Sequence, residues 1–184
     1  MNNFIILEFK EPWFNNPFKP EEETHMKYLN TLVGFREFPD EISLCINITN
    51  CPFHCPGCHS PELWEDIGTE LTFDELDRLI KSNKGITCVG FMGGNLKEIN
   101  LLAEYVKNIN PPLKVGWYTG GIVEENELLK LEFFDYIKSG PYIRELGGLN
   151  CPSTNQRFYK IEHLENEIKW LNLTYKFWKN GNNN

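Results

Sequence analysis

Residues 42–59 read ISLCINITNCPFHCPGCH, an apolar segment followed directly by a loop rich in cysteine and proline. Isoleucine or leucine occupies every second position of the apolar segment, which predicts a β-strand over 42–48 with one apolar face. Beyond the strand, Cys51, Cys55 and Cys58 have the spacing C-x3-C-x2-C. Thiolates this close together on a tightly turning loop can surround one metal centre. The segment therefore predicts a strand that leads into a metal-binding loop.

Two kinds of metal centre suit these cysteines. A structural zinc ion needs a fourth ligand, which His54 or His59 could supply. An iron–sulfur cube usually takes four cysteines, so three leave one iron without a protein ligand and open to a substrate.

The other cysteines lie outside this loop. Cys45 and Cys88 fall inside predicted strands and are expected to be small buried residues. Cys151 falls in a predicted loop, where a structural thiol, a fourth ligand and a redox role all remain open.

Strands and helices alternate on the carboxyl side of the cysteine loop. Thr72 and Asn95, each with a glutamate three residues later, predict the starts of two helices. A short helix is predicted over 124–130, and further strands over 86–91, 115–118, 134–137 and 158–161. This order implies parallel strands joined by right-handed crossovers. About five strands are too few for a closed eight-stranded barrel. The predicted fold is α/β, an open or partial βα barrel with a mostly parallel sheet.

The turns that follow the predicted strands are expected to share one edge of the sheet. Four segments directly follow predicted strands: the cysteine loop and the turns at 93–94, 119–121 and 139–141. In folds of this kind, the catalytic and ligand-binding residues lie at the carboxyl ends of the strands.

Three regions are predicted. Residues 1–42 look irregular, with scattered prolines and aromatics, and are expected to pack as an extension on the domain formed by 43–161. Residues 162–184 are predicted to start as a helix, to continue as helix or extended chain, and to end in a polar tail.

Composition excludes several classes of protein. The chain has 184 residues, of which 41% are hydrophobic, so wholesale disorder is excluded. Its 18 basic and 26 acidic residues give a net charge of −8, which argues against nucleic-acid binding. The early apolar run is too short for a signal peptide or a membrane span. We therefore expect a cytoplasmic protein without nucleic-acid or membrane partners, whose cysteines are reduced.

Several segments resemble one known family. C-x3-C-x2-C directly after the first strand resembles the radical S-adenosylmethionine superfamily. CPGCHSPELW at 55–64 resembles the cluster loop of the activating protein of anaerobic (class III) ribonucleotide reductase. FMGGN at 91–95 stands where that family carries a Gly-Gly-acidic motif, and WYTGG at 117–121 and the segment 135–161 resemble its later strands. The resemblance spans nearly two thirds of the chain.

The resemblance implies a radical generator with a partial barrel of the radical S-adenosylmethionine type. A [4Fe-4S] cluster on Cys51, Cys55 and Cys58 would bind S-adenosylmethionine at its open iron and cleave it reductively. The radical formed would take hydrogen from a glycine Cα of the large subunit of the anaerobic reductase. The electron would come from a donor such as flavodoxin or ferredoxin. Two alternatives remain: a small radical enzyme acting on a metabolite, and a non-catalytic zinc-binding module.

The resemblance also implies residues that bind S-adenosylmethionine. Gly57, Cys58 and His59 lie where the family's backbone approaches the adenosine, although His59 could equally be a surface histidine.

Further cofactor contacts fall at the ends of the later strands. Gly93 and Gly94 would expose backbone to the methionine amino group, unless they form an ordinary turn. Asn95 replaces the family's acidic residue, and either Lys138 or Ser139 would meet the cofactor's carboxylate, with a solvated lysine as the alternative for Lys138.

Overall fold

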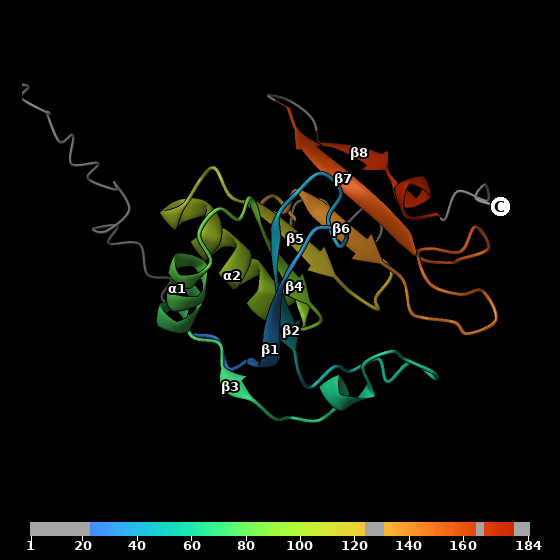
Figure 1. Cartoon of the computed structure of the whole chain (residues 1–184), viewed down its shortest axis with the longest axis horizontal. Coiled ribbons are helices and arrows are strands. Elements are labelled where there is room, and N and C mark those ends of the chain that lie inside the picture. The colour runs from blue at the N-terminus through green and yellow to red at the C-terminus, as the bar shows by residue number, and fades with distance from the viewer. Residues whose placement is uncertain (1–22, 124–130, 165–167, 179–184) are drawn as a thin grey trace, which may run out of the picture.

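The computed structural model describes residues 23–123, 131–164 and 168–178 (Figure 1). These residues form one eight-stranded sheet with two α-helices. The strands are β1 (Lys27–Gly34), β2 (Ser43–Ile48), β3 (Thr69–Glu70), β4 (Cys88–Met92), β5 (Lys114–Tyr118), β6 (Tyr136–Ser139), β7 (Arg157–His163) and β8 (Ile168–Asn172). The helices are α1 (Phe73–Ser82) and α2 (Leu96–Ile109), with short 3-10 helices η1 (Pro61–Trp64) and η3 (Thr174–Phe177).

The sheet is open and mixed, with the strand order β3-β1-β2-β4-β5-β6-β7-β8. The four central strands β2, β4, β5 and β6 are parallel to one another. The outer pairs, β3 with β1, β1 with β2, β6 with β7 and β7 with β8, are antiparallel. The α/β class and the open sheet are confirmed, but the prediction of a mostly parallel sheet is wrong. The strands that the sequence analysis missed, β1, β3 and β8, all pair antiparallel with their neighbours, and so does β7 with β6.

Both ends of the described chain add strands that the sequence analysis did not predict. Residues 27–34 form β1 rather than irregular structure, and their pattern is weak because Leu32 and Val33 are exposed. The helix expected to begin near residue 162 is also wrong, because 168–172 form β8. There Trp170 packs edge-on against Tyr159 of β7, with ring centroids 5.1 Å apart. The predicted helix over 124–130 lies outside the described residues.

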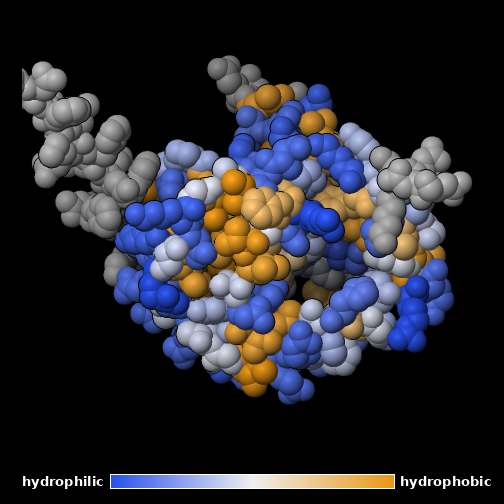
Figure 2. All heavy atoms as spheres, viewed as in Figure 1, coloured by the Kyte–Doolittle hydropathy of each residue, from blue (hydrophilic) through white to orange (hydrophobic). Residues whose placement is uncertain are grey.

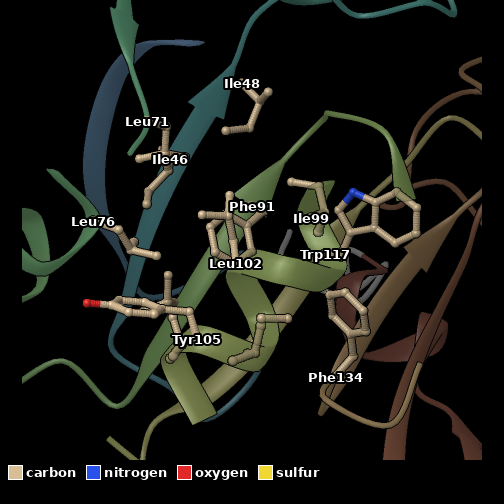
Figure 3. Packing of buried hydrophobic residues seen from close by; sticks show 14 of the residues in the cluster. Ile46, Ile48, Leu71, Leu76, Phe91, Ile99, Leu102, Tyr105, Trp117 and Phe134 are labelled. Carbon is tan, nitrogen blue, oxygen red and sulfur yellow. The ribbon is translucent and has the colours of Figure 1, made fainter. Parts of the chain in front are cut away.

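Both α-helices cover one face of the sheet (Figure 1). They start as predicted: Thr72 and Asn95 are the caps, and each side chain accepts a hydrogen bond from the backbone N–H three residues later. Between helices and strands lies the larger hydrophobic core, in which α2 meets β2, β4 and β5 (Figure 3). No helix in the described ranges is both long and apolar enough to cross a membrane.

A second, smaller hydrophobic cluster lies on the opposite face of the sheet, and the ring of Phe38 is part of it. Phe38, which is fully buried, lies over Gly90 of β4 and Gly116 of β5, where a Cβ atom would come within 2.2 Å and 1.9 Å of its ring. The segment around Phe38 is tied down because Tyr118 donates a hydrogen bond to the carbonyl of Glu37. The middle of this face is therefore closed, and the loops beyond the strands' carboxyl ends surround the remaining space.

Candidate metal centre

Four loops meet at the carboxyl edge of the parallel strands, as predicted. They follow β2 (49–60), β4 (93–95), β5 (119–121) and β6 (140–156). Backbone hydrogen bonds join neighbouring loops: Gly93 N donates to Tyr118 O at 2.9 Å, and Gly140 N donates to Gly121 O at 2.7 Å. The parallel register thus brings segments far apart in sequence into one rim.

Tight turns give the cysteine loop its shape. His54 and Gly57 have positive φ angles of 41° and 76°, which let the chain reverse direction twice between the cysteines. Cys58 N donates to Cys55 O at 3.0 Å and closes the second turn. At the loop's start, Cys51 N donates to Leu63 O at 2.9 Å, which anchors the loop to η1. All three cysteines are free thiols with partly exposed side chains.

One contact braces the cysteine loop from β5. The ring of Phe53 lies on Gly120, where a Cβ atom would be 2.6 Å from its Cγ. A side chain at position 120 would therefore push the loop away from β5.

The loop after β6 braces the cysteine loop from the other side. Arg144 lies against Gly57, where a Cβ atom would be 2.9 Å from its Nε. Tyr142 packs against His59 with ring centroids 5.3 Å apart, so His59 contacts this loop. Sequence analysis missed Phe53, Tyr142 and Arg144, because contacts between separate loops leave no spacing signal.

A groove lies between these two loops. It has a volume of about 340 Å³ and is lined by Pro56, Gly57, Tyr142, Ile143, Arg144 and Glu145. Seen as spheres, the molecule is also hollowed to the right of its centre, on the side where Figure 1 places the cysteine loop and the loop after β6 (Figure 2).

Lys138 and Ser139 point in opposite directions from the end of β6. Lys138 is buried, and its Nζ donates to the carbonyl of Gly140 at 2.7 Å. Ser139 faces the other way, where its Oγ donates to Gly121 O at 3.0 Å and accepts from Val123 N at 2.9 Å. Of the two side chains, Lys138 is the one on which the cysteines of the loop after β2 act electrostatically, a choice that strand alternation alone left open.

The three thiols act electrostatically on Lys138. Burial lowers the pKa of Lys138 from its ordinary value of 10.5 to about 8. The charges of Cys55, Cys58 and Cys51 work against this effect and raise the pKa. The ammonium group of Lys138 is thus close enough to the three sulfur atoms at the carboxyl edge to interact with them electrostatically.

The surroundings of Gly93, Gly94 and Asn95 are explained by local packing. Gly94 has a φ of 81°, and a Cβ atom there would lie 2.9 Å from the side chain of Ile99 in the core. A Cβ atom at Gly93 would lie 3.2 Å from the carbonyl oxygen of Ile48. Asn95 uses its side-chain oxygen to cap α2 and its amide to reach the carboxylate of the same first turn. Their predicted cofactor contacts remain predictions.

The donor set fits a cluster held by three cysteines. Among the residues that the structure describes, no group of three or more histidine, cysteine, aspartate or glutamate side chains is placed to hold a single metal ion. A [4Fe-4S] cube makes a different demand, because each thiolate binds a different iron. Three free, partly exposed thiols on one loop, beside a buried cation, meet that demand in number and kind.

Comparison with protein-family models adds independent information. A model described as a 4Fe-4S single cluster domain matches residues 41–158, a range that contains the cysteine loop and the three other loops of the rim. Searches of curated proteins and of solved structures gave no match.

Proposed function

The chain belongs to the 4Fe-4S single cluster domain family, and from this premise we propose that Cys51, Cys55 and Cys58 hold one [4Fe-4S] cluster. The observation that carries the proposal is the position of three free thiols on one loop at the carboxyl edge of the parallel strands. Loops at this edge are where ligands bind in open α/β sheets. Three cysteines leave one iron for a ligand from outside the protein.

We further propose that this outside ligand is S-adenosylmethionine and that the protein is an activase of anaerobic ribonucleotide reductase. When both are bound, the cluster and S-adenosylmethionine supply reductive cleavage of the sulfonium bond and hydrogen abstraction from a glycine Cα. The resemblance at residues 55–64, 91–95, 117–121 and 135–161 supports this narrower assignment.

The chain's own residues would bind, orient and shield the cofactor. The Lys138 ammonium is buried and has carbonyl oxygens as partners, so it is available to attract a carboxylate. The backbone of Gly93 and Gly94 lies on the same rim, where an amino group can find carbonyl acceptors. Phe53 of the cysteine loop rests on Gly120, and Tyr142 packs against His59 of the same loop, so contacts with two neighbouring loops hold the site in place.

The open architecture favours a protein substrate over a metabolite. The sheet ends in β3 on one side and β8 on the other, so the described strands do not close around the site. A small substrate needs extensive enclosure to be oriented, whereas a large partner can cover an open rim itself. Phe53 and Ile143 on this rim are 38% and 37% exposed and offer apolar contact area. The proposed partners are the reductase's large subunit and an electron donor such as flavodoxin or ferredoxin.

The test starts with anaerobic reconstitution of the cluster and measurement of 5′-deoxyadenosine with a chemical reductant. The reductase subunit, deuterated at its glycine Cα positions, is then added. We expect a glycine-centred doublet in paramagnetic resonance and deuterium in the 5′-deoxyadenosine. If the cluster forms and cleavage occurs but deuterium comes only from a free metabolite, the small-molecule alternative is correct.

Single cysteine variants test the ligand set. Cys51→Ala, Cys55→Ala and Cys58→Ala each remove a required thiolate, so each should lose most of the bound iron and all S-adenosylmethionine cleavage. Cys45→Ala is the matched control. Burial raises the pKa of Cys45 to about 12, so this thiol stays protonated and the variant should keep its cluster. A full cluster and normal cleavage in Cys55→Ala would show that the loop has been assigned wrongly.

A further inference from the structure

Lys138 is the one lysine among the described residues whose side chain is buried, with 9% of its surface exposed. Its Nζ has two partners, the carbonyl oxygens of Gly140 at 2.7 Å and Thr119 at 3.4 Å. No carboxylate of the described chain forms an ion pair with it. The contrast is Lys107, whose ammonium lies 2.6 Å from a carboxylate oxygen of Asp135.

A buried ammonium without a counter-charge is costly, because burial removes the water that stabilises the charge. Carbonyl dipoles recover only part of this loss. The groups of the described chain that favour protonated Lys138 are Cys55, Cys58 and Cys51, which carry negative charge as thiolates. The lysine and the three cysteines come from β6 and from the loop after β2, and the parallel strands place them at the same edge.

We propose that Lys138 is the fixed charge partner of the three-cysteine site and raises the reduction potential of the cluster held there. The inference rests on the proposed function in one respect, the cluster on Cys51, Cys55 and Cys58. Reduction adds one electron, taken from the external reductant, to a site that is already rich in negative thiolate charge. A nearby cation stabilises the more negative, reduced state more than the oxidised one.

This role differs from contact with the carboxylate of S-adenosylmethionine, because it acts before any such ligand arrives. Lys138 is here a tuning residue that works through the cluster. The measurement that isolates this role is the cluster's midpoint potential without S-adenosylmethionine.

The experiment compares four reconstituted proteins: wild type, Lys138→Met, Lys138→Arg and Lys160→Met. Lys138→Met keeps the length of the side chain and removes a buried charge, so its fold should not suffer. Lys138→Arg keeps the charge. Lys160→Met is the control, since Lys160 lies on the neighbouring β7 and its charge is already paired with Glu162 at 2.9 Å. Iron content, and the potential from a spectroscopic titration at pH 7, are measured for each.

In Lys138→Met we expect the ratio of reduced to oxidised cluster at a fixed applied potential to fall about tenfold. For a one-electron couple this corresponds to a midpoint about 59 mV lower. Lys138→Arg and Lys160→Met should stay close to wild type. An unchanged midpoint in Lys138→Met, or an equal decrease in Lys160→Met, overturns the inference.

Cluster uptake gives the remaining outcomes. If Lys138→Met folds without taking up iron while Lys138→Arg takes it up, the site needs the positive charge, and the role of Lys138 as charge partner of the three cysteines holds. If both variants fold and fail, the shape of the side chain matters instead, and the inference is wrong. If wild type itself takes up no cluster, the proposed function is wrong. If wild type takes up the cluster and Lys138→Met has the same midpoint potential, only the proposed role of Lys138 is refuted.

Discussion

At the scale of single residues, Gly94 and Gly85 offer a direct comparison of backbone strain with packing. Both have positive φ, 81° and 85°. A Cβ atom at Gly94 would meet Ile99 at 2.9 Å and Met26 at 3.0 Å, whereas nothing lies within 4 Å of one at Gly85. The two positions thus share the strain of a left-handed conformation and differ in crowding.

We predict that Gly94→Ala lowers the free energy of unfolding by about 2–4 kcal/mol, the sum of left-handed strain and overpacking. Gly85→Ala should lower it by only about 1 kcal/mol, from strain alone. Urea unfolding of the two variants measures both values. Equal losses would contradict the packing argument, and weaker S-adenosylmethionine binding at unchanged stability would instead favour the predicted cofactor contact of Gly94.

At the scale of elements, α1 is fastened to β1 by one carboxylate. Glu75 accepts hydrogen bonds from Arg78 on its own helix, at 2.7 Å and 2.6 Å, and from the Tyr28 hydroxyl on β1. The hydrogen bond from Arg78, followed by that from Tyr28, lowers the pKa of Glu75 from 4.5 to about 2. The carboxylate is therefore favoured in the folded state.

This pKa shift predicts a pH dependence of stability. Because the folded pKa is lower than the unfolded one, the stabilisation is complete above about pH 4.5 and disappears as the pH falls toward 2. Over this window the free energy of unfolding should decrease more steeply in wild type than in Glu75→Gln. Urea unfolding at pH 6, 4 and 3 is the measurement. Parallel pH profiles for the two proteins would show that Glu75 contributes nothing.

The segment that carries Phe38 is predicted to be coupled to the central strands. Gly116→Ala would place a methyl group 1.9 Å from the present position of the Phe38 ring, so we expect a loss of about 1–3 kcal/mol. Phe38→Ala should cost about 3–5 kcal/mol. In the double variant the new methyl group has room, so its total loss should be smaller than the sum by at least about 1 kcal/mol. Additive losses would mean that the ring does not rest on β5.

Local signals in the sequence predicted the elements that carry the site. Thr72 and Asn95 were identified as caps because a cap and its partner lie three residues apart. The cysteine loop and the glycine turns were placed at one edge because parallel strands end together. The antiparallel β1 and β8 were missed, because the exposed apolar residues of β1 break its alternation and the spacing of Ile168 and Leu171 also fits a helix. Contacts such as Arg144 on Gly57 join distant segments and follow only from the assembled sheet.

At the scale of the whole molecule, the hydrophobic core is complete without the cysteine loop. The two clusters of buried hydrophobic residues lie on the two faces of the sheet, and neither contains Cys51, Cys55 or Cys58. The loop thus adds a site to a framework held together by apolar packing. A cluster that binds only the folded state stabilises it by mass action, without being needed for folding.

Removal of the metal therefore separates a cofactor from a structural ion. We predict that the metal-free protein keeps its far-ultraviolet circular dichroism and unfolds cooperatively, with a thermal midpoint only a few degrees below that of the loaded protein. A loss of about 1 kcal/mol in a domain of this size corresponds to about 2–4 °C. Metal-free Cys58→Ala is the control. Its thermal midpoint should equal that of metal-free wild type, since neither protein has a bound cluster to lose. A structural zinc site supplies folding energy itself, so its chelation unfolds the domain. Collapse of the circular dichroism on chelation, reversed by zinc and not by iron with sulfide, would establish the zinc module in place of the cluster.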